Sequence, residues 1–435
     1  MELNLKLSQI GQKMSRKVGV RAIMGDIQEV LASGSDQYTN LSVGNPSILP
    51  EVTAVWESKL KELLLDEAFS SIISQYGSSY GTDELIESVV RFFNNEYGLT
   101  LDRSNVLITA GSQNLFFLAI NAFCGVGTDS KLKKALIPML PDYSGYSGVA
   151  LDETMIEGIP PIVSKLDDHT FRYELDKEAF LEKMYNDPDI GAVVLSRPNN
   201  PCGNILSEED IEAISKVCGE LNIPCLIDSA YAPPFPAINF VEMEPVFHES
   251  IIHCLSISKT GLAGERVGIA IGSAAFIQVM EAFQSNASIH SSRLGQCMVA
   301  AAINDGSLMS VSKTSIRPYY KKKFAVLEEA LMNAMPHDKK WFLHKGEGSL
   351  FAWIWFEDLP VGDMELYETL KAHYVIVVPG SSFFHNNTSK RTDHEQRCIR
   401  ISLTVSDEEM RKGIETLAAV VSSIYDAHKE SLNMI

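Results

Sequence analysis

Short apolar segments of strand length alternate with amphipathic segments of helical period through most of this chain. This alternation is typical of an α/β domain, in which helices cover both faces of a mostly parallel sheet. We therefore expect a mostly parallel central sheet sandwiched by helices. The expected strands are 105–109 (NVLIT), 134–139 (KALIPM), 191–196 (GAVVLS), 223–228 (IPCLID), 251–256 (IIHCLS) and 267–272 (VGIAIG).

Two helices are indicated by their own local signals. Residues 207–221 begin with Ser207 and have Asp210 three positions later, which is a variant of the capping box that starts helices. Apolar residues then recur on one face of this segment. Residues 83–97 show the same helical spacing. The apolar positions are Ile211, Ile214, Val217 and Leu221 in the first helix, and Leu85, Val89 and Phe93 in the second.

The character of the sequence changes after about residue 310. A long polar helix pattern is followed by three apolar segments, GEGSLFAWIWF, VIVVPG and CIRISL, which are separated by loops. A chain of 435 residues exceeds the size of one ordinary domain. We expect a large domain over residues 46–310, a smaller α+β domain over 311–435, and an N-terminal segment, 1–45, that packs with the small domain.

Charge and cysteine content narrow the classes of partner and compartment. The net charge of −19 argues against nucleic acid and anionic membranes, which are bound mainly by clustered Lys and Arg. Seven scattered cysteines without CxxC spacing indicate neither a disulfide framework nor a zinc site. The N-terminal segment lacks the apolar core of a signal peptide, and no apolar run reaches membrane-spanning length. The sequence therefore predicts a cytoplasmic protein that binds neither nucleic acid nor membranes.

Four of the expected strands are followed by unusual sets of polar residues. These sets are AGSQN, RPNNPCGN, DSAYAPPFP and SISKTGLAGER. Ligands of open α/β sheets bind beyond the carboxyl ends of the strands. We therefore expect the four sets to form one site.

Two of these sets contain groups that suit a phosphorylated, nitrogen-containing ligand. Gly111, Ser112 and Gln113 lie between a strand and an apolar helix, so backbone N–H groups there could hold a phosphate, although a turn of this kind taken alone more often reflects tight packing. Asp228 ends an apolar strand, and a buried carboxylate needs a cationic partner. That partner is either another side chain or a protonated pyridine nitrogen.

Lys259 and Arg266, from the fourth polar set, are two further candidate site residues. Lys259 follows an apolar strand, and a desolvated amine beside other cations is neutral enough to attack a carbonyl. Arg266 could supply the neighbouring charge and a bidentate phosphate contact. Most lysines at strand ends are simply solvated, but the combination with the other polar sets favours a catalytic site.

The segments SRPNNPCGN, DSAY and SxSKxGLxGxRxG, in this order and spacing, resemble the class I/II aminotransferases, which are fold-type-I pyridoxal-phosphate enzymes. The resemblance extends from GNPS near the start of the chain to CIRIS near its end. Within the family, SVGNPSILPE, TAGSQNLFF, PFPAINF, GLAGERVGI and VPGSSFF resemble the valine–pyruvate aminotransferase branch. Cys202 and Ala110 depart from the residues common in the family at their positions.

The resemblance implies a role for each site residue. Lys259 would form a Schiff base with pyridoxal 5′-phosphate and move protons, and Asp228 would pair with the pyridine nitrogen of the cofactor. Tyr231 and Asn200 would hydrogen-bond the 3-oxygen of the ring, and Tyr143 would stack on the ring. The phosphate would be held by Gly111, Ser112, Gln113, Ser256, Ser258, Arg266 and, from a second subunit, Tyr76. Arg400, with Gly44 and Asn200, would bind the substrate α-carboxylate.

The predicted activity is the transfer of an amino group between a small aliphatic amino acid, valine or alanine, and a 2-oxo acid, pyruvate or 2-oxoisovalerate. The residues that would set this preference are expected in the N-terminal segment, where Val20 and Ile23 could line an apolar pocket. The role of Tyr76 implies a homodimer with shared active sites.

Alternative activities remain open at this point. Arg293 could bind an acidic side chain and so indicate a glutamate or aspartate substrate, and an aromatic substrate or a lyase reaction on the same fold is also possible. A nucleotide-dependent dehydrogenase would need a GxGxxG turn after the first strand, which the sequence lacks.

Overall fold

The computed structural model describes residues 6–17, 19–34, 37–152, 154–385 and 392–433. Its largest sheet has the strand order β2-β11-β10-β9-β8-β4-β3, and β5 also pairs with β4. All six expected strands belong to it. The strands are β2 (Val106–Thr109), β3 (Gly125–Val126), β4 (Leu132–Ile137), β5 (Ile156–Gly158), β8 (Ile190–Ser196), β9 (Cys225–Asp228), β10 (Ile251–Ser256) and β11 (Gly268–Ile271).

The pairing within this sheet is mostly parallel. β4, β5, β8, β9 and β10 run in one direction, whereas β11 is antiparallel to both of its neighbours, β2 and β10. Successive residues of the strands enter opposite cores, as Val106 and Ile108 pack in one core and Leu107 packs in the other. Both faces are therefore buried, and the expected α/β architecture is confirmed.

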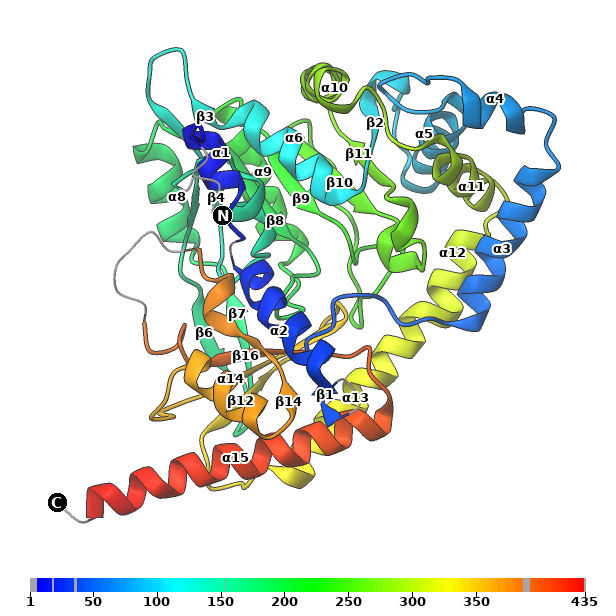
Figure 1. Cartoon of the computed structure of the whole chain (residues 1–435). Helices are drawn as coiled ribbons and strands as arrows, with labels where there is room; N and C mark the ends of the chain where they lie inside the picture. The colour runs from blue at the N-terminus through cyan, green and yellow to red at the C-terminus, as the bar shows by residue number, and fades with distance from the viewer. Residues whose placement is uncertain (1–5, 18, 35–36, 153, 386–391, 434–435) are drawn as a thin grey trace.

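Helices cover the two faces of this sheet (Figure 1). α6 (Ser112–Phe123) contacts β10, β11 and β8, while α5 (Asp83–Tyr97) packs with α11 (Arg293–Asn304) beside β2. α9 (Glu208–Glu220) begins at Ser207, whose side chain and that of Asp210 form the reciprocal capping box. The remaining helices before residue 312 are α1 (Gln9–Met14), α2 (Val20–Gly34), α3 (Pro50–Leu64), α4 (Phe69–Ser74), α7 (Gly145–Val149), α8 (Lys177–Asn186), α10 (Ala274–Ser288) and α12 (Ser307–Val311).

A second sheet of six strands has the order β15-β16-β13-β12-β7-β6. Its strands are β6 (Ile162–Lys165), β7 (Thr170–Glu174), β12 (Trp341–His344), β13 (Phe351–Phe356), β15 (Val378–Pro379) and β16 (Cys398–Ser402). Three helices lie in the same part of the chain: α13 (Arg317–Ala334), α14 (Asp363–Ala372) and α15 (Asp407–Asn433).

The hairpin β6–β7 falls inside the range expected for the large domain, yet it pairs with β12 of the second sheet. The pairing is parallel, with Thr170 opposite Leu343. The chain therefore contributes to the second sheet twice, once from its middle and once from its C-terminal third. The domain limits at residues 45 and 310 stay a prediction.

The N-terminal segment contacts elements that lie beside both sheets. Lys13 of α1 donates from Nζ to the carbonyl of Ser147 at 2.7 Å, beside the first sheet. Asp26 of α2 accepts hydrogen bonds from Tyr367 (2.5 Å) and Lys371 (3.1 Å) of α14. β1 (Thr39–Asn40) then pairs with β14 (Val375–Ile376). α2 thus crosses the space between the two sheets, as Figure 1 shows.

None of the described helices combines the length and apolarity that a membrane-spanning helix needs.

Candidate functional site

A cavity of about 510 Å³ lies at the carboxyl ends of β8, β9 and β10, and α2 forms part of its lining. Polar side chains follow each of these strands, so parallel pairing brings them to the same edge of the sheet. Most of the predicted site residues line this cavity. They are Gly44, Ser112, Gln113, Tyr143, Asn200, Asp228, Tyr231, Ser256, Ser258, Lys259, Arg266 and Arg400.

Asp228 is a buried carboxylate at the end of β9. Its Oδ1 accepts a hydrogen bond from the backbone N–H of Ala230 at 3.1 Å, and its Oδ2 lies 3.4 Å from the hydroxyl of Tyr146. Burial raises the pKa of Asp228 to about 7, against the lowering effect of these bonds and of the Lys259 charge. The carboxylate forms no ion pair with a described side chain. A cationic ligand in the cavity would therefore lower its pKa.

Lys259 lies in η3 (Ser258–Thr260), directly after β10. Its Nζ donates a hydrogen bond to the carbonyl of Gly44 at 2.8 Å. Burial lowers the pKa of Lys259 to about 8, and the charges of Arg400 and Arg266 act in the same direction. A larger fraction of this amine is thus neutral near pH 7 than for an ordinary lysine. A neutral amine can act as a nucleophile or accept a proton.

An anion site is formed by the start of α6 and by Arg266. Gly111, which precedes α6, has a φ of +83°, and a Cβ at this position would overlap the Arg266 guanidinium. Arg266 donates from Nη1 to the hydroxyl of Ser258 at 3.1 Å. The first N–H groups of a helix have no partner within the helix and favour an anion. Because Gly111 has no side chain, the Arg266 guanidinium can lie close to the backbone at the start of α6. Gly111 itself does not line the cavity.

Gln113 and Tyr143 form a pair on the wall of the cavity. The Tyr143 hydroxyl donates to Oε1 of Gln113 at 3.0 Å, while Nε2 of Gln113 is buried without a hydrogen-bond partner among the described residues. Burial raises the pKa of Tyr143, and the nearby charge of Arg21 opposes that rise. A buried donor without a partner is costly, so Gln113 is suited to bind a ligand oxygen.

Arg400 of β16 enters the cavity from the second sheet. Its guanidinium stacks on the ring of Phe351 (3.8 Å to the ring centroid) and lies 5.0 Å from that of Phe383. Nη1 donates to Oδ1 of Asn200 at 3.1 Å, and Nε is buried without a partner among the described residues. Burial lowers the pKa of Arg400 to about 10. The guanidinium is thus held in one orientation with an N–H still available for a carboxylate.

Tyr231 and Asn200 occupy neighbouring positions around Arg400 and Asp228. Burial raises the pKa of the Tyr231 phenol, and the charge of Asp228 raises it further, whereas that of Arg400 lowers it. The backbone N–H of Asn200 donates to the Ser196 hydroxyl at 3.1 Å, which fixes the loop after β8. Both side chains therefore present polar groups to the cavity from fixed positions.

Tyr76 and Arg293 lie away from this cavity. Tyr76 is 85% exposed and does not line it, so any role at the phosphate would require a second subunit. Arg293 donates from Nη1 to the carbonyls of Ser71 (3.1 Å) and Gln75 (3.2 Å). Within one subunit its observed contacts hold the backbone of α4 and the loop that follows.

Val20 was expected to line an apolar pocket and does line this cavity, whereas its other apolar lining residues were not predicted. Val20, Met24 and Ile27 of α2 form an apolar stripe at helical spacing, and Val43 and Phe351 line the same cavity. Ile23, expected beside Val20, instead lines a neighbouring cavity. At 100° per residue Ile23 lies at one edge of the face that Val20, Met24 and Ile27 share, and there it borders the neighbouring cavity. Periodicity in GVRAIMGDI could have identified the stripe but not which face it presents.

Taken together, the cavity offers a partly neutral lysine, a buried carboxylate, an anion site and a fixed arginine. This set suits a phosphorylated cofactor that carries a basic ring nitrogen, together with a substrate that carries a carboxylate.

Comparison with known proteins indicates the aminotransferases, the same enzyme family that the sequence motifs resemble. The sequence model of the family "Aminotransferase class I and II" matches residues 36–417. Valine–pyruvate aminotransferase of Escherichia coli (strain K12) is 30% identical over 414 residues, which cover 95% of this chain and 97% of the relative.

Solved structures show the same similarity in three dimensions. The structure of valine–pyruvate aminotransferase from Salmonella typhimurium LT2 matches with a TM-score of 0.82 and 28% identity, covering 92% of this chain and 99% of that one. A protein from Psychrobacter arcticum 273-4, whose name assigns it only provisionally as an amino-acid aminotransferase, matches with a TM-score of 0.92 and 31% identity, covering 97% and 100%.

Proposed function

Because this chain belongs to the class I and II aminotransferase family, we propose that it moves the amino group of a small aliphatic amino acid, valine or alanine, to a 2-oxo acid. Aminotransferase activity and the cofactor, pyridoxal 5′-phosphate, follow from the family. The aliphatic substrate is the proposed part, and the apolar stripe of α2 is the observation that carries it.

Three observations indicate that the cavity suits this cofactor. Asp228 is buried without a cationic partner among the described residues, which matches a protonated pyridine nitrogen. Nε2 of Gln113 lacks an acceptor, and Gly111 leaves room for the Arg266 guanidinium beside the first N–H groups of α6. When bound, pyridoxal phosphate supplies an electron-withdrawing ring that takes up the charge left on the substrate Cα after proton removal.

Lys259 is the group proposed to move that proton. Its amine lies at the end of β10, in the cavity that Asp228 and Arg400 also line. Its lowered pKa, about 8, keeps part of the amine neutral, so Nζ can accept a proton from the substrate Cα and return it. Tyr231, on the loop after β9, and Asn200, on the loop after β8, are proposed to hold the 3-oxygen of the cofactor ring.

Arg400 is proposed to bind the substrate α-carboxylate. Stacking on Phe351 and the bond to Asn200 orient the guanidinium before substrate arrives, and its free Nε–H can donate to a carboxylate oxygen. A preoriented arginine loses little conformational entropy on binding. The side chain of the substrate then extends into the rest of the cavity.

The part of the cavity that α2 lines favours an aliphatic side chain on the substrate. Val20, Met24 and Ile27 present apolar groups from α2, and Val43 and Phe351 add to this surface. Arg293, which could have indicated an acidic substrate, is bound to backbone carbonyls of α4 and the loop after it. The relatives named valine–pyruvate aminotransferase support the same proposal.

We also propose a homodimer with shared active sites. Exposed apolar side chains gather in the segment from 48 to 76, where Ile48 is 90%, Leu65 87% and Tyr76 85% exposed. A second subunit on this surface would bury them and could bring Tyr76 to the neighbouring phosphate site. The cytoplasmic location stays a prediction.

The substrate proposal is tested by steady-state kinetics of the purified holoenzyme. Valine is paired with pyruvate, alanine with 2-oxoisovalerate, and glutamate and phenylalanine with pyruvate. We expect kcat/KM for valine or alanine to exceed that for the other two donors by at least about tenfold, the discrimination that one or two methylene contacts provide. Preference for glutamate or phenylalanine contradicts the aliphatic proposal, and turnover without any 2-oxo acid indicates a lyase.

A further inference from the structure

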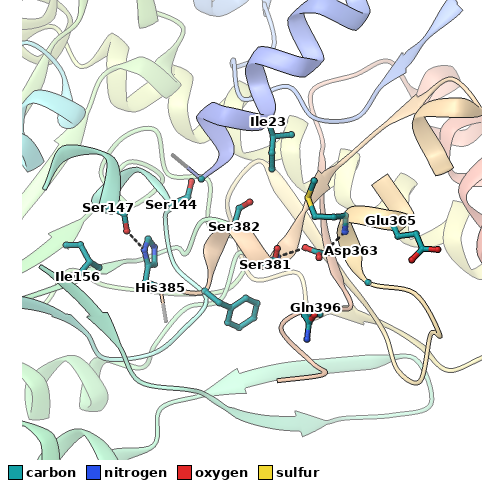
Figure 2. A pocket seen from close by; sticks show the side chains of 14 residues that line it. Ile23, Ser144, Ser147, Ile156, Asp363, Glu365, Ser381, Ser382, His385 and Gln396 are labelled. Carbon is teal, nitrogen blue, oxygen red and sulfur yellow. Dashed lines mark hydrogen bonds between the residues drawn. The ribbon is translucent and has the colours of Figure 1, made fainter. Parts of the chain in front are cut away.

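The segment 142–147, which carries Tyr143, forms a wall between two cavities. Tyr143 lines the cavity of about 510 Å³ that contains Lys259, whereas Ser144 and Ser147 line a second cavity of about 770 Å³ (Figure 2). Tyr146 packs in the core, whereas Tyr143 and Ser147 are only half-buried beside these cavities. Directed bonds therefore add to packing in fixing the wall at these two residues.

His385 makes these bonds from the second sheet. It follows η6 (Gly380–Phe383), which continues directly from β15. Its Nε2 lies 3.1 Å from the carbonyl oxygen of Tyr143 and 3.3 Å from that of Asp142. Its Nδ1 lies 2.7 Å from Oγ of Ser147, an interaction drawn in Figure 2.

The partners determine which ring nitrogen carries the proton. Carbonyl oxygens only accept, so Nε2 must be the N–H that donates to Tyr143 and Asp142. Nδ1 is then the acceptor, and the Ser147 hydroxyl donates to it. The imidazole is buried, and burial lowers the pKa of His385 to about 4, so the ring is neutral at physiological pH and all its bonding capacity is used.

We infer that His385 is a positioning residue for cofactor binding: its Nε2–H holds the backbone of Tyr143 and thereby the ring that faces the cofactor. The inference rests on the proposed stacking role of Tyr143. His385 does not itself line the cavity that contains Lys259, and its bond to the lining is made at the backbone carbonyl of Tyr143. A residue on the segment that continues from β15 through η6 would thus position part of a site built mainly on the first sheet.

A second hydrogen bond joins the segment that carries Tyr143 to the segment that carries His385. It allows the effect of the imidazole to be distinguished from the pairing of these two segments. The backbone N–H of Asp142 donates to the carbonyl of Phe383 at 3.1 Å. This bond does not involve the imidazole and is retained in any His385 variant. The segments therefore remain paired when the side chain is replaced, and only the hold on the Tyr143 carbonyl is lost.

The test uses four variants of the full chain: His385→Ala, His385→Gln, His385→Asn and Ser147→Ala. The glutamine amide places an N–H close to the position of Nε2, whereas the shorter asparagine amide reaches only the position of Nδ1. For each protein we would measure the dissociation constant for pyridoxal phosphate, the visible circular dichroism of the bound cofactor, and the melting temperature of the apoprotein.

We expect His385→Ala and His385→Asn to weaken cofactor binding about tenfold and to reduce the visible dichroism, the effect of losing one buried donor. His385→Gln should stay within about threefold of wild type, and Ser147→Ala within about twofold. If His385→Ala is too unstable to study, the comparison of glutamine with asparagine still decides the matter.

Three results would overturn the inference. One is equal cofactor binding by the glutamine and asparagine variants. Another is a loss in Ser147→Ala as large as in His385→Ala, which would assign the effect to the Nδ1 contact. The third is a lower apoprotein melting temperature with unchanged affinity and dichroism, which would mean a structural role only. Failure of the proposed function is distinguishable, because it would appear in the wild type as absence of amino transfer.

Discussion

The hydroxyl of Tyr146 lies 3.4 Å from Oδ2 of Asp228, and both side chains are buried. Tyr146 is three residues from Tyr143 in sequence, and their rings meet edge to face at a centroid distance of 5.4 Å. The segment from Tyr143 into the first turn of α7 therefore connects the residue proposed to stack on the cofactor ring to the carboxylate proposed at its nitrogen.

Removing this hydroxyl should change the pH dependence of cofactor binding. The Tyr146 hydrogen bond lowers the pKa of Asp228, so Tyr146→Phe raises that pKa above about 7. The proposed pairing of Asp228 with a protonated pyridine nitrogen needs the ionised carboxylate, so affinity for pyridoxal phosphate should be lost as the pH falls through this pKa. The midpoint of that loss should move upward in Tyr146→Phe, by less than about one unit for one weak bond. Titration of the apoprotein at several pH values measures this midpoint. Tyr185→Phe, at an exposed tyrosine, is the control; an unchanged or lower midpoint in Tyr146→Phe contradicts the expectation.

The amine of Lys259 should react with cofactor at an unusually low pH. Its pKa is lowered to about 8, and only the neutral amine is a nucleophile, so the rate of covalent cofactor attachment to the apoprotein should rise with pH through a midpoint near 8. Stopped-flow visible absorption measures this rate. An ordinary lysine would show a midpoint near 10.4 instead, which would refute the proposed environment. Lys259→Arg is the control, since a guanidinium stays charged.

Replacing Arg400 by lysine should not preserve activity. The lysine keeps the charge but loses the planar fork and the stacking on Phe351, so kcat/KM for the amino acid should fall at least about a hundredfold, mostly through KM. The loss should be much smaller for a primary amine that lacks a carboxylate. Arg411→Lys, on the surface beside Glu329, should behave as wild type. Equal losses for the amino acid and the amine would show that Arg400 does not bind the carboxylate.

Adjacent residues of α2 should differ in their effect on substrate preference. Met24 lines the cavity that contains Lys259, and Ile23 lines the neighbouring cavity beside Ser144. Met24→Ala removes apolar contact from the proposed side-chain pocket, so kcat/KM for valine relative to alanine should fall about tenfold. Ile23→Ala is a matched control from the same helix and should leave this ratio within about twofold. If both variants change the ratio equally, the stripe is not the pocket.

Features that depend on neighbouring residues could be predicted from the sequence. The Ser207 capping box places the start of α9 correctly, and the position of Asp228 at the end of an apolar strand indicates its place at the sheet edge. Because parallel strands end at one edge, the order of strands and polar sets along the chain was enough to assign the sets after β2, β8, β9 and β10 to one site. The roles given to these residues rest on the family resemblance and stay predictions.

Contacts between distant parts of the chain could not be predicted. His385 is separated from Tyr143 by 242 positions, and nothing around it distinguishes it from a solvated histidine. In the hairpin β6–β7, β7 alternates the buried Phe171 and Tyr173 with more exposed neighbours, while β6 has no buried residue. Such a pattern can indicate a strand, but it does not identify β12 as the partner. Such pairings are decided by packing of the whole molecule rather than by local preference.

The parallel pairing of β7 with β12 also bears on the order in which the molecule can assemble. During synthesis, β7 emerges from the ribosome long before Trp341–His344, its neighbour in the sheet. Until that segment is translated, one edge of the hairpin has unpaired N–H and C=O groups, which are open to pairing with other nascent chains. The second sheet therefore cannot form strand by strand in the order of synthesis. A ribosome-bound fragment that ends before β12 is the species that chaperones would have to protect.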